Sequence, residues 1–479
     1  MDTRIRELFP HQQEGVERAI RNGRVLLVRP LGSGKTALGL HVAERVLSTA
    51  DAPGLWISPA HLLPQLLGEK DRWGLSISIK VLEEIPPQII PNVLYAMSYD
   101  RLRLCRDWVL RHRWNLVVVD EFQHTKNPAT QNHQIVKLLS RNVNFFIGMT
   151  GVPFQNSPYE FFNLVALVAG KSIQGKLEAC LAYKYERKYP WFIRIIRNLL
   201  GIRPQRGPIT GIQDPDTLIG LLRPHVDYRS PRQVAGQCGI PEVISEIVRV
   251  EMRPSELVEY RKKTRTHRKL VDRKFFEDDL EEETLERGFS RVADLRQLLL
   301  ESSEGPSSKV TTLCQDVQKV IQRQADARVI IFSNFVDHGV MVISRYLNTL
   351  HVPHAVYTGE VCINLKTQII ESFKKGTIPV LVLSPVGFEG LNLEGTTHVF
   401  IADPHYNPEV TAQLIARATR VYGPVRTVQV FHYLSYSRKL EKGTIDEIIL
   451  RIAQRKASVN EAIQKLLEDA SWAGTRQTL

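Results

Sequence analysis

The sequence has few cysteines, and none of them is spaced as a metal module or a disulfide framework would require. Its 479 residues include five cysteines, an odd number, and no two of them form a C-x-x-C pair. They are scattered along the chain as Cys105, Cys180, Cys238, Cys314 and Cys362. This pattern argues against a zinc module and against a small disulfide-stapled fold, and it favours a reducing compartment.

Long hydrophobic runs and an N-terminal apolar segment are also missing. The stretch NLVALVAG (163–170) is far shorter than the ~20 residues that a membrane-spanning helix needs. The first ten residues, MDTRIRELFP, contain no apolar core of a signal peptide. We therefore expect an intracellular protein with no membrane partner, cytoplasmic or nucleoid-associated in a prokaryote and nuclear or virion-associated otherwise.

Acidic residues are outnumbered by basic ones. The chain has 63 Lys and Arg against 51 Asp and Glu, which gives a formal net charge of +12 and a pI of about 9.4. This excess is typical of proteins with a polyanionic partner, most commonly nucleic acid. The length is too great for a single core and predicts two or three domains.

A glycine-rich loop stands between two patterned stretches near the N-terminus. Residues 24–28 read RVLLV, a strand pattern, and residues 36–47 carry apolar residues near helical spacing. Between them lies GSGKT (32–36). Strand, glycine loop and helix are the context of a P-loop, in which backbone N–H groups face the phosphates. Lys35 would then reach the β- and γ-phosphates and the Thr36 hydroxyl would bind Mg²⁺. The alternative is a turn with a surface lysine.

Two acidic residues follow an apolar run further along the chain. Residues 116–119 read LVVV, which is typical of a strand buried on both faces, and Asp120 and Glu121 come directly after it. Acids at the carboxyl end of a parallel strand lie where α/β sheets place their chemistry. We expect Asp120 to bind Mg²⁺ and Glu121 to orient the attacking water; a helix cap is the alternative. Another apolar strand ends at Thr150, in a loop suited to sensing the γ-phosphate.

A second α/β series begins at about residue 309 and has no P-loop of its own. It ends in the stretch VTAQLIARATRVYG (410–423), where Gln413, Arg417 and Arg420 share one helical face. Arginines on a helix are often only solvated. A lobe without a phosphate loop can, however, supply arginine fingers to a nucleotide bound on the other lobe. We therefore expect the nucleotide to lie between two lobes.

The ordered motifs resemble those of helicase superfamily two, and specifically the Swi/Snf-like double-stranded DNA translocases. LFPHQQEGV resembles the adenine-reading motif, with Gln12 at the glutamine position, PLGSGKT resembles motif I and DEFQHTKNP motif II. TGVPFQNSPYEFFNLV is similar to motif III, VIIFSNF to motif IV, SPVGFEGLNL to motif V and DPHYNPEVTAQLIARATRVYG to motif VI. The resemblance covers nearly the whole chain, in the family's order.

The resemblance implies an ATP hydrolase that uses ATP and Mg²⁺. It assigns catalytic roles to Lys35, Asp120, Glu121, Gln413, Arg417 and Arg420. It assigns nucleotide contacts to Gln12, Gly32, Ser33, Gly34, Lys35, Thr36 and Gly390, and metal binding to Thr36 and Asp120.

Three departures from the family pattern stand out. Arg29-Pro30-Leu31 replaces residues that are more often acidic or methionine, and Arg29 also takes the place of the first glycine in the general P-loop pattern. Phe388 stands where motif V usually has a second glycine, and motif VI ends in Tyr422-Gly423-Pro424. These departures spare the expected catalytic positions, so an active ATPase is expected.

The expected fold class is α/β, with two tandem RecA-like parallel-sheet lobes and helical insertions. Residues 1–225 form an N-terminal ATP-binding lobe with a helical protrusion at about 170–215. Residues 226–305 form a linker and a helical, charged protrusion, and residues 306–479 form a C-terminal lobe with a closing brace helix. Within these, 183–206 is basic and aromatic, and a basic block at 261–274 precedes an acidic block at 277–286.

Three functions are compatible with these motifs. The first is a DNA-dependent ATPase that translocates on double-stranded DNA through sequence-independent backbone contacts, remodels or displaces nucleoprotein complexes, and is targeted by a protein partner. The second is a strand-separating DNA or RNA helicase. The third is an ATP-gated recruitment module that acts with a partner effector and barely turns over.

Overall fold

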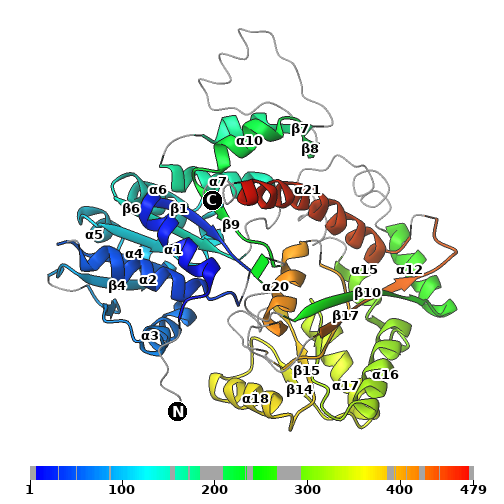
Figure 1. The fold of residues 1–479 in the computed structure, drawn as a ribbon. Helices are drawn as coiled ribbons and strands as arrows, with labels where there is room; N and C mark the ends of the chain where they lie inside the picture. The colour runs from blue at the N-terminus through cyan, green and yellow to red at the C-terminus, as the bar shows by residue number, and fades with distance from the viewer. Residues whose placement is uncertain are drawn as a thin grey trace.

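The protein has two lobes, each built on its own parallel β-sheet (Figure 1). This computed structural model describes residues 7–30, 32–49, 51–85, 88–151, 157–170, 173–183, 209–231, 233–234, 241–266, 293–385, 393, 395–405, 407–419, 427–441 and 443–473. The expected α/β fold class with two parallel-sheet lobes is confirmed. No helix within these ranges is long and apolar enough to cross a membrane.

The first lobe has a seven-stranded sheet in which all neighbouring strands are parallel. In spatial order its strands are β3 (Ser78–Val81), β4 (Val93–Ser98), β2 (Gly54–Ser58), β5 (Leu116–Val119), β6 (Phe145–Thr150), β1 (Arg24–Val28) and β9 (Val226–Tyr228). Alternate residues of β1 enter two separate cores, Leu26 and Val28 on one face and Val25 and Leu27 on the other. Because both faces of the strand are buried, its sequence is a continuous apolar run instead of an alternating pattern.

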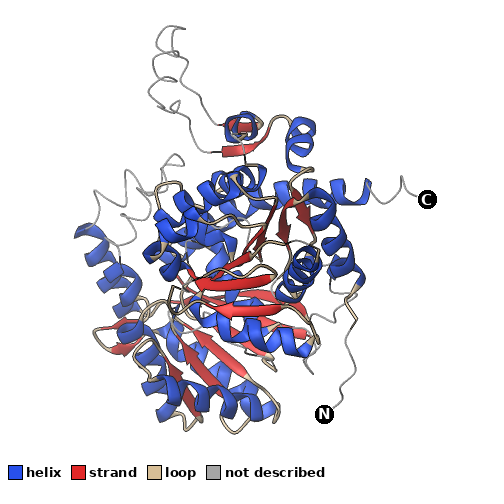
Figure 2. Cartoon of the chain, turned by 90° about the vertical axis from the view of Figure 1, so that its left-hand side faces the viewer, coloured by secondary structure: helices blue, strands red, loops and turns tan. Residues whose placement is uncertain are grey.

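Helices cover both faces of this sheet, as Figure 2 shows. The helices of this lobe are α1 (Pro10–Asn22), α2 (Lys35–Ser48), α3 (Leu63–Arg72), α4 (Tyr99–Leu104), α5 (Arg106–Arg111), α6 (Gln131–Arg141), α7 (Pro158–Ala169), α8 (Gln174–Ala179) and α10 (Pro215–Leu222). Local sequence sets their ends: Thr130 caps α6 with its side chain, and α7 starts with Pro158 and stops at Gly170, which has a φ of 67°. An antiparallel pair, β7 (Leu181–Tyr183) and β8 (Ile209–Ile212), flanks the insertion.

The second lobe has a six-stranded parallel sheet. Its spatial order is β10 (Glu242–Glu251), β17 (Thr427–Tyr436), β16 (His398–Ile401), β13 (Val329–Phe332), β15 (Val380–Leu383) and β14 (His354–Tyr357). The surrounding helices are α12 (Pro254–Thr266), α15 (Ala293–Leu298), α16 (Ser308–Arg323), α17 (Met341–Thr349), α18 (Ile363–Lys375) and α20 (Pro408–Ala418), with a short hairpin of β11 (Glu301–Ser302) and β12 (Gly305–Pro306). As in the first lobe, β13 alternates between two cores.

The segment 226–305 contributes more to the two sheets than the sequence indicated. We expected a linker and a protrusion there, but β9 is the edge strand of the first sheet and β10 is the edge strand of the second. The boundary between the sheets therefore falls between residues 228 and 242. The basic and aromatic stretch beyond Tyr183, and the charged blocks beyond Thr266, lie outside the described residues.

The last helix, α21 (Ile445–Ala473), connects the two lobes and is drawn in red in Figure 1. Near its start, Ile445 and Ile449 pack in a core of the second lobe with α12 and α15. Further along, Ile463 and Leu467 pack in the core of the first lobe. We expected residues 306–479 to form a C-terminal lobe with a closing brace helix, and α21 packs against the cores of both lobes.

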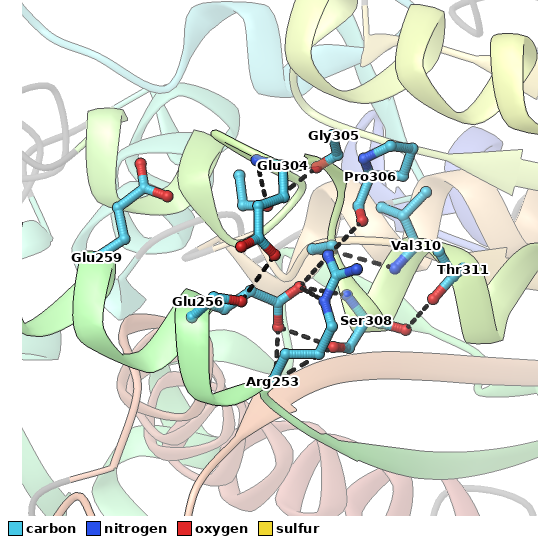
Figure 3. A network of polar contacts seen from close by, with 12 residues as sticks. Arg253, Glu256, Glu259, Glu304, Gly305, Pro306, Ser308, Val310 and Thr311 are labelled. Atoms are coloured by element: carbon cyan, nitrogen blue, oxygen red, sulfur yellow. Dashed lines mark hydrogen bonds and ion pairs between the residues drawn. The ribbon is translucent and has the colours of Figure 1, made fainter.

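A buried polar network fixes the start of α12 to the start of α16 (Figure 3). The Glu256 carboxylate accepts hydrogen bonds from the Ser308 backbone N–H at 2.6 Å, the Ser308 hydroxyl at 2.8 Å and Arg253 at 2.8 Å. Arg253 also donates to the Pro306 carbonyl at 2.8 Å. Next to this network, the fully buried Lys309 and Asp446 form an ion pair at 2.7 Å, which attaches α21 to the second lobe.

Candidate active site

The phosphate loop lies between β1 and α2, at the carboxyl edge of the first sheet. Gly32 and Gly34 have φ values of 80° and 78°, a left-handed conformation that favours glycine. A Cβ on Gly34 would lie 2.3 Å from the Gln12 amide nitrogen, so a larger residue would displace the Gln12 side chain as well as strain the backbone. Lys35 and the half-buried Thr36 are the first two residues of α2, and the N–H groups of this first turn can bind an anion.

Gln12 holds this loop against the start of α1. Its side-chain oxygen accepts the Phe9 N–H at 2.9 Å, and its side-chain nitrogen donates to the Ser33 carbonyl at 3.0 Å. The resemblance assigns Gln12 to adenine recognition. In this structure both ends of the side chain contact the protein, so adenine recognition by Gln12 stays a prediction.

The two acids lie at the end of β5, on a strained turn. Glu121 has a φ of 46°, an uncommon value for a residue other than glycine. The Asp120 carboxylate accepts the Glu121 N–H at 2.9 Å, and the Tyr99 hydroxyl donates to the Asp120 carbonyl at 2.7 Å. Sequence reasoning missed Tyr99. The available signal was its position directly after the apolar strand β4, at the same edge of the sheet.

A hydrogen-bonded chain connects the end of β6 to Glu121. The Thr150 hydroxyl donates to the side-chain oxygen of Gln123 at 2.7 Å, and the Gln123 amide donates to the Glu121 carboxylate at 2.7 Å. Thr150 was expected only as part of a γ-phosphate-sensing loop. The structure shows that it fixes the orientation of the Gln123 amide, which in turn fixes the Glu121 carboxylate.

We expect Thr150→Val to lower kcat by about 3- to 10-fold with little change in KM, because one hydrogen bond that orients Glu121 is lost while the volume is kept. Steady-state ATP hydrolysis measures both constants. The matched control is Thr130→Val, which removes the cap of α6 and should lower the melting temperature without changing kcat. Equal kcat values for Thr150→Val and the parent protein would contradict this role of the hydrogen-bonded chain.

Lys35 and the two acids form one electrostatic unit. Burial and the neighbouring charge of Glu121 raise the pKa of Asp120 to about 7, although Lys35 and the Glu121 N–H oppose the shift. Burial also acts to raise the pKa of Glu121, but Lys35, the Gln123 amide and Arg417 outweigh it and hold that pKa below its ordinary value. Glu121 is therefore ionised at neutral pH, as a group that polarises water has to be.

Arg417, on the other lobe, lies near enough to this unit for its charge to act on Glu121. It lies near the end of α20, and its positive charge stabilises the ionised form of Glu121. Its Nε is buried without a hydrogen-bond partner among the described residues. The structure therefore brings together Lys35, Asp120, Glu121 and Arg417 from two separate sheets. Gln413 lies one turn earlier on α20, whereas Gly390 and Arg420 lie outside the described residues.

The donor atoms near the loop fit a hard divalent cation. The Thr36 hydroxyl and the Asp120 carboxylate are oxygen donors of the kind that Mg²⁺ prefers, and a cation would relieve the cost of the buried Asp120 charge. No group of three or more His, Cys, Asp or Glu side chains able to hold a metal is found within the described ranges. A Mg²⁺ ion at this loop would thus be bound with phosphate oxygens of the nucleotide.

Two parallel-sheet lobes, a phosphate loop with an acid pair on one of them, and an arginine from the other define a helicase-type ATP-hydrolysing enzyme. Comparison with known families gives the same result. Residues 92–303 match the SNF2-related domain, and residues 308–422 match the helicase conserved C-terminal domain. The chain belongs to the Swi/Snf-like family of superfamily two ATPases.

Individual relatives are distant. An uncharacterized ATP-dependent helicase of Mycoplasma pneumoniae is 24% identical over 98% of this chain and 43% of its own length. The DNA repair and recombination protein RAD54-like of Danio rerio is 22% identical over 95% of this chain and 67% of its own length. The chain thus spans less than half of the first relative and two thirds of the second. Among solved structures, the Hef helicase domain of Pyrococcus furiosus matches with a TM-score of 0.55 at 16% identity, covering 93% of this chain and 98% of that one, which shows a shared fold.

Proposed function

We propose that the protein is a DNA-dependent ATPase that translocates on double-stranded DNA and remodels or displaces nucleoprotein complexes. The proposal rests on Arg417 of the second lobe, whose buried Nε has no hydrogen-bond partner among the described residues and whose charge acts on Glu121 of the first lobe. A reaction centre assembled from both lobes couples ATP hydrolysis to their relative movement, as a motor requires.

In this proposal each lobe has a separate part in the reaction. The phosphate loop and Lys35 bind the triphosphate, with Mg²⁺ held by Thr36 and Asp120. Glu121, oriented by Gln123, polarises the attacking water, and Arg417 stabilises the charge that develops on the transferred phosphoryl group. We propose that Gln413 and Arg420 also have catalytic roles and that Gly390 contributes to nucleotide binding.

Double-stranded DNA is the proposed polymer. The net charge of +12 suits a polyanion, and the relative from Danio rerio is named for DNA repair and recombination. Backbone contacts alone are enough for translocation, since they position a protein on DNA without reading its sequence. Binding by such contacts releases counterions that are condensed on the DNA. Because this release is less favourable at higher salt concentration, the DNA affinity falls steeply as salt increases.

We expect duplex DNA to stimulate ATP hydrolysis more than single-stranded DNA or RNA does. Phosphate release measured with each polymer, and with none, tests this, with Lys35→Ala as the inactive control. The DNA affinity should fall with salt at a log–log slope of about −0.9 for each neutralised phosphate. Greater stimulation by RNA, or release of a strand in a displacement assay, would favour a strand-separating helicase; slow hydrolysis unaffected by any polymer would favour a recruitment module.

A further inference from the structure

Arg29 is a buried arginine whose side chain the proposed chemistry does not use. It stands where the general P-loop pattern has its first glycine. Its side chain is 1% exposed and forms an ion pair at 2.5 Å with Asp227 of β9, which is also 1% exposed. The guanidinium donates further to the backbone carbonyls of Asp227 at 2.6 Å and Val28 at 3.1 Å.

The backbone of Arg29 contacts two parts of the candidate site, the end of β6 and Lys35. Its N–H donates to the Thr150 carbonyl at 3.1 Å, at the end of β6. Its carbonyl lies 3.4 Å from the Lys35 ammonium, which contacts the Pro30 carbonyl at 3.3 Å as well. One residue thus connects β1, β6 and β9 to the lysine of the phosphate loop.

Asp227 is in turn held by α1 and by its neighbours on β9. Arg18 of α1 donates to the Asp227 carboxylate at 3.4 Å and to the Val226 carbonyl at 2.8 Å. The Arg229 N–H donates to the Val28 carbonyl at 3.0 Å, which continues the pairing of β9 with β1. β9 is also the last strand of the first sheet, and the next strand along the chain, β10, belongs to the second sheet.

We propose that Arg29 is a positioning residue for ATP binding, whose ion pair with Asp227 fixes the phosphate loop and Lys35 to β9, the strand from which the chain leaves the first lobe. This inference rests on the proposed ATPase function and adds a determinant of nucleotide affinity to it. Where the general P-loop pattern has a flexible glycine, this chain has an arginine that is held in place by its ion pair with Asp227.

A double apolar substitution separates positioning from simple stability. Replacing a buried ion pair by apolar residues of similar volume often leaves stability unchanged or increased. A pair with only a structural function therefore tolerates this replacement with no change in nucleotide binding. A positioning pair does not, because the first residue of the loop loses its anchor, and Lys35 and the loop N–H groups are then no longer held where they would bind the phosphates.

The experiment compares the parent protein with Arg29→Met/Asp227→Leu. Melting temperature, steady-state ATP hydrolysis and the Kd of a fluorescent ADP analogue are measured for both. The double variant should stay folded, with KM for ATP and the Kd raised at least 10-fold and kcat lowered less. Arg24→Met is the matched control, since Arg24 is at the other end of β1 and donates to the carbonyls of Ser140, Val143 and Val168. It should lower the melting temperature and leave KM and Kd unchanged.

The outcomes distinguish this inference from the function on which it rests. Parental KM and Kd in a folded double variant would overturn the positioning role of Arg29 while leaving the ATPase proposal intact. A parent protein that binds the analogue but does not hydrolyse ATP even with duplex DNA present would overturn the ATPase proposal. The Kd comparison would still test the role of Arg29. If the double variant does not fold, Arg29→Lys replaces it: a Kd raised at least 3-fold supports positioning, and an unchanged Kd contradicts it.

Discussion

Arg417→Ala should lower kcat for ATP hydrolysis by about 10³- to 10⁵-fold, the effect expected for an arginine finger. Affinity for ATP should change little, because the phosphate loop and Lys35 belong to the first lobe and remain intact. The expected loss is large because, among the described residues of the second lobe, Arg417 is the one whose positive charge acts on Glu121. Single-turnover hydrolysis, together with nucleotide titration, separates the two effects.

Two further variants make this result specific. Arg345→Ala removes an arginine from the same lobe that is 65% exposed and paired with Glu301, and it should hydrolyse ATP at the parental rate. Arg417→Lys keeps the charge but not the planar, forked donor geometry, and it should recover only a small part of the activity. If Arg417→Ala retains a tenth or more of the parental kcat, hydrolysis does not depend on the second lobe as proposed.

Glu121→Gln should lower kcat by about 10²- to 10⁴-fold, the usual range for loss of a general base. The amide keeps the size of the side chain and its contact with Gln123, but it does not accept a proton from water. ATP should still bind, and the protein should accumulate in the ATP-bound form with the lobes together. Phosphate release and retention of labelled ATP on a filter measure the two properties.

The control for Glu121→Gln is Glu44→Gln, on α2 of the same lobe. Glu44 accepts hydrogen bonds from the Ser76 N–H at 2.6 Å and the Ser76 hydroxyl at 2.9 Å, and it has no part in the proposed site. Its replacement should leave kcat unchanged. Hydrolysis by Glu121→Gln at the parental rate would show that another group activates the water.

The sequence was sufficient to predict elements formed by residues close together in the chain. The order of β1, phosphate loop and α2, and the acids directly after β5, follow from local pattern and adjacency. Because parallel strands end at the same edge of a sheet, the sequence also indicated that these two segments meet. The arginine helix was found from the face shared by Gln413 and Arg417 together with the resemblance.

Pairs of side chains far apart in the sequence could not be predicted in this way. Arg29 and Asp227 form a buried ion pair across 198 positions, and nothing in the local pattern at either residue indicates the other. Gln123 lies within the stretch that resembles motif II, but its bond to Thr150 depends on the neighbouring positions of β5 and β6. Sheet membership of β9 and β10 was missed because short or edge strands leave a weak periodic signal.

The attachment of α21 to both lobes limits how the two sheets can move apart. Its 29 residues correspond to a rod of about 43 Å, and such a rod resists stretching because every turn is hydrogen-bonded. The end near Asp446 is attached to the second lobe by a charge pair, and further along the helix Ile463 and Leu467 pack in the apolar core of the first lobe. Any separation of the lobes that withdraws these two side chains from the first lobe would expose their apolar surface to water, at a cost that grows with the area uncovered.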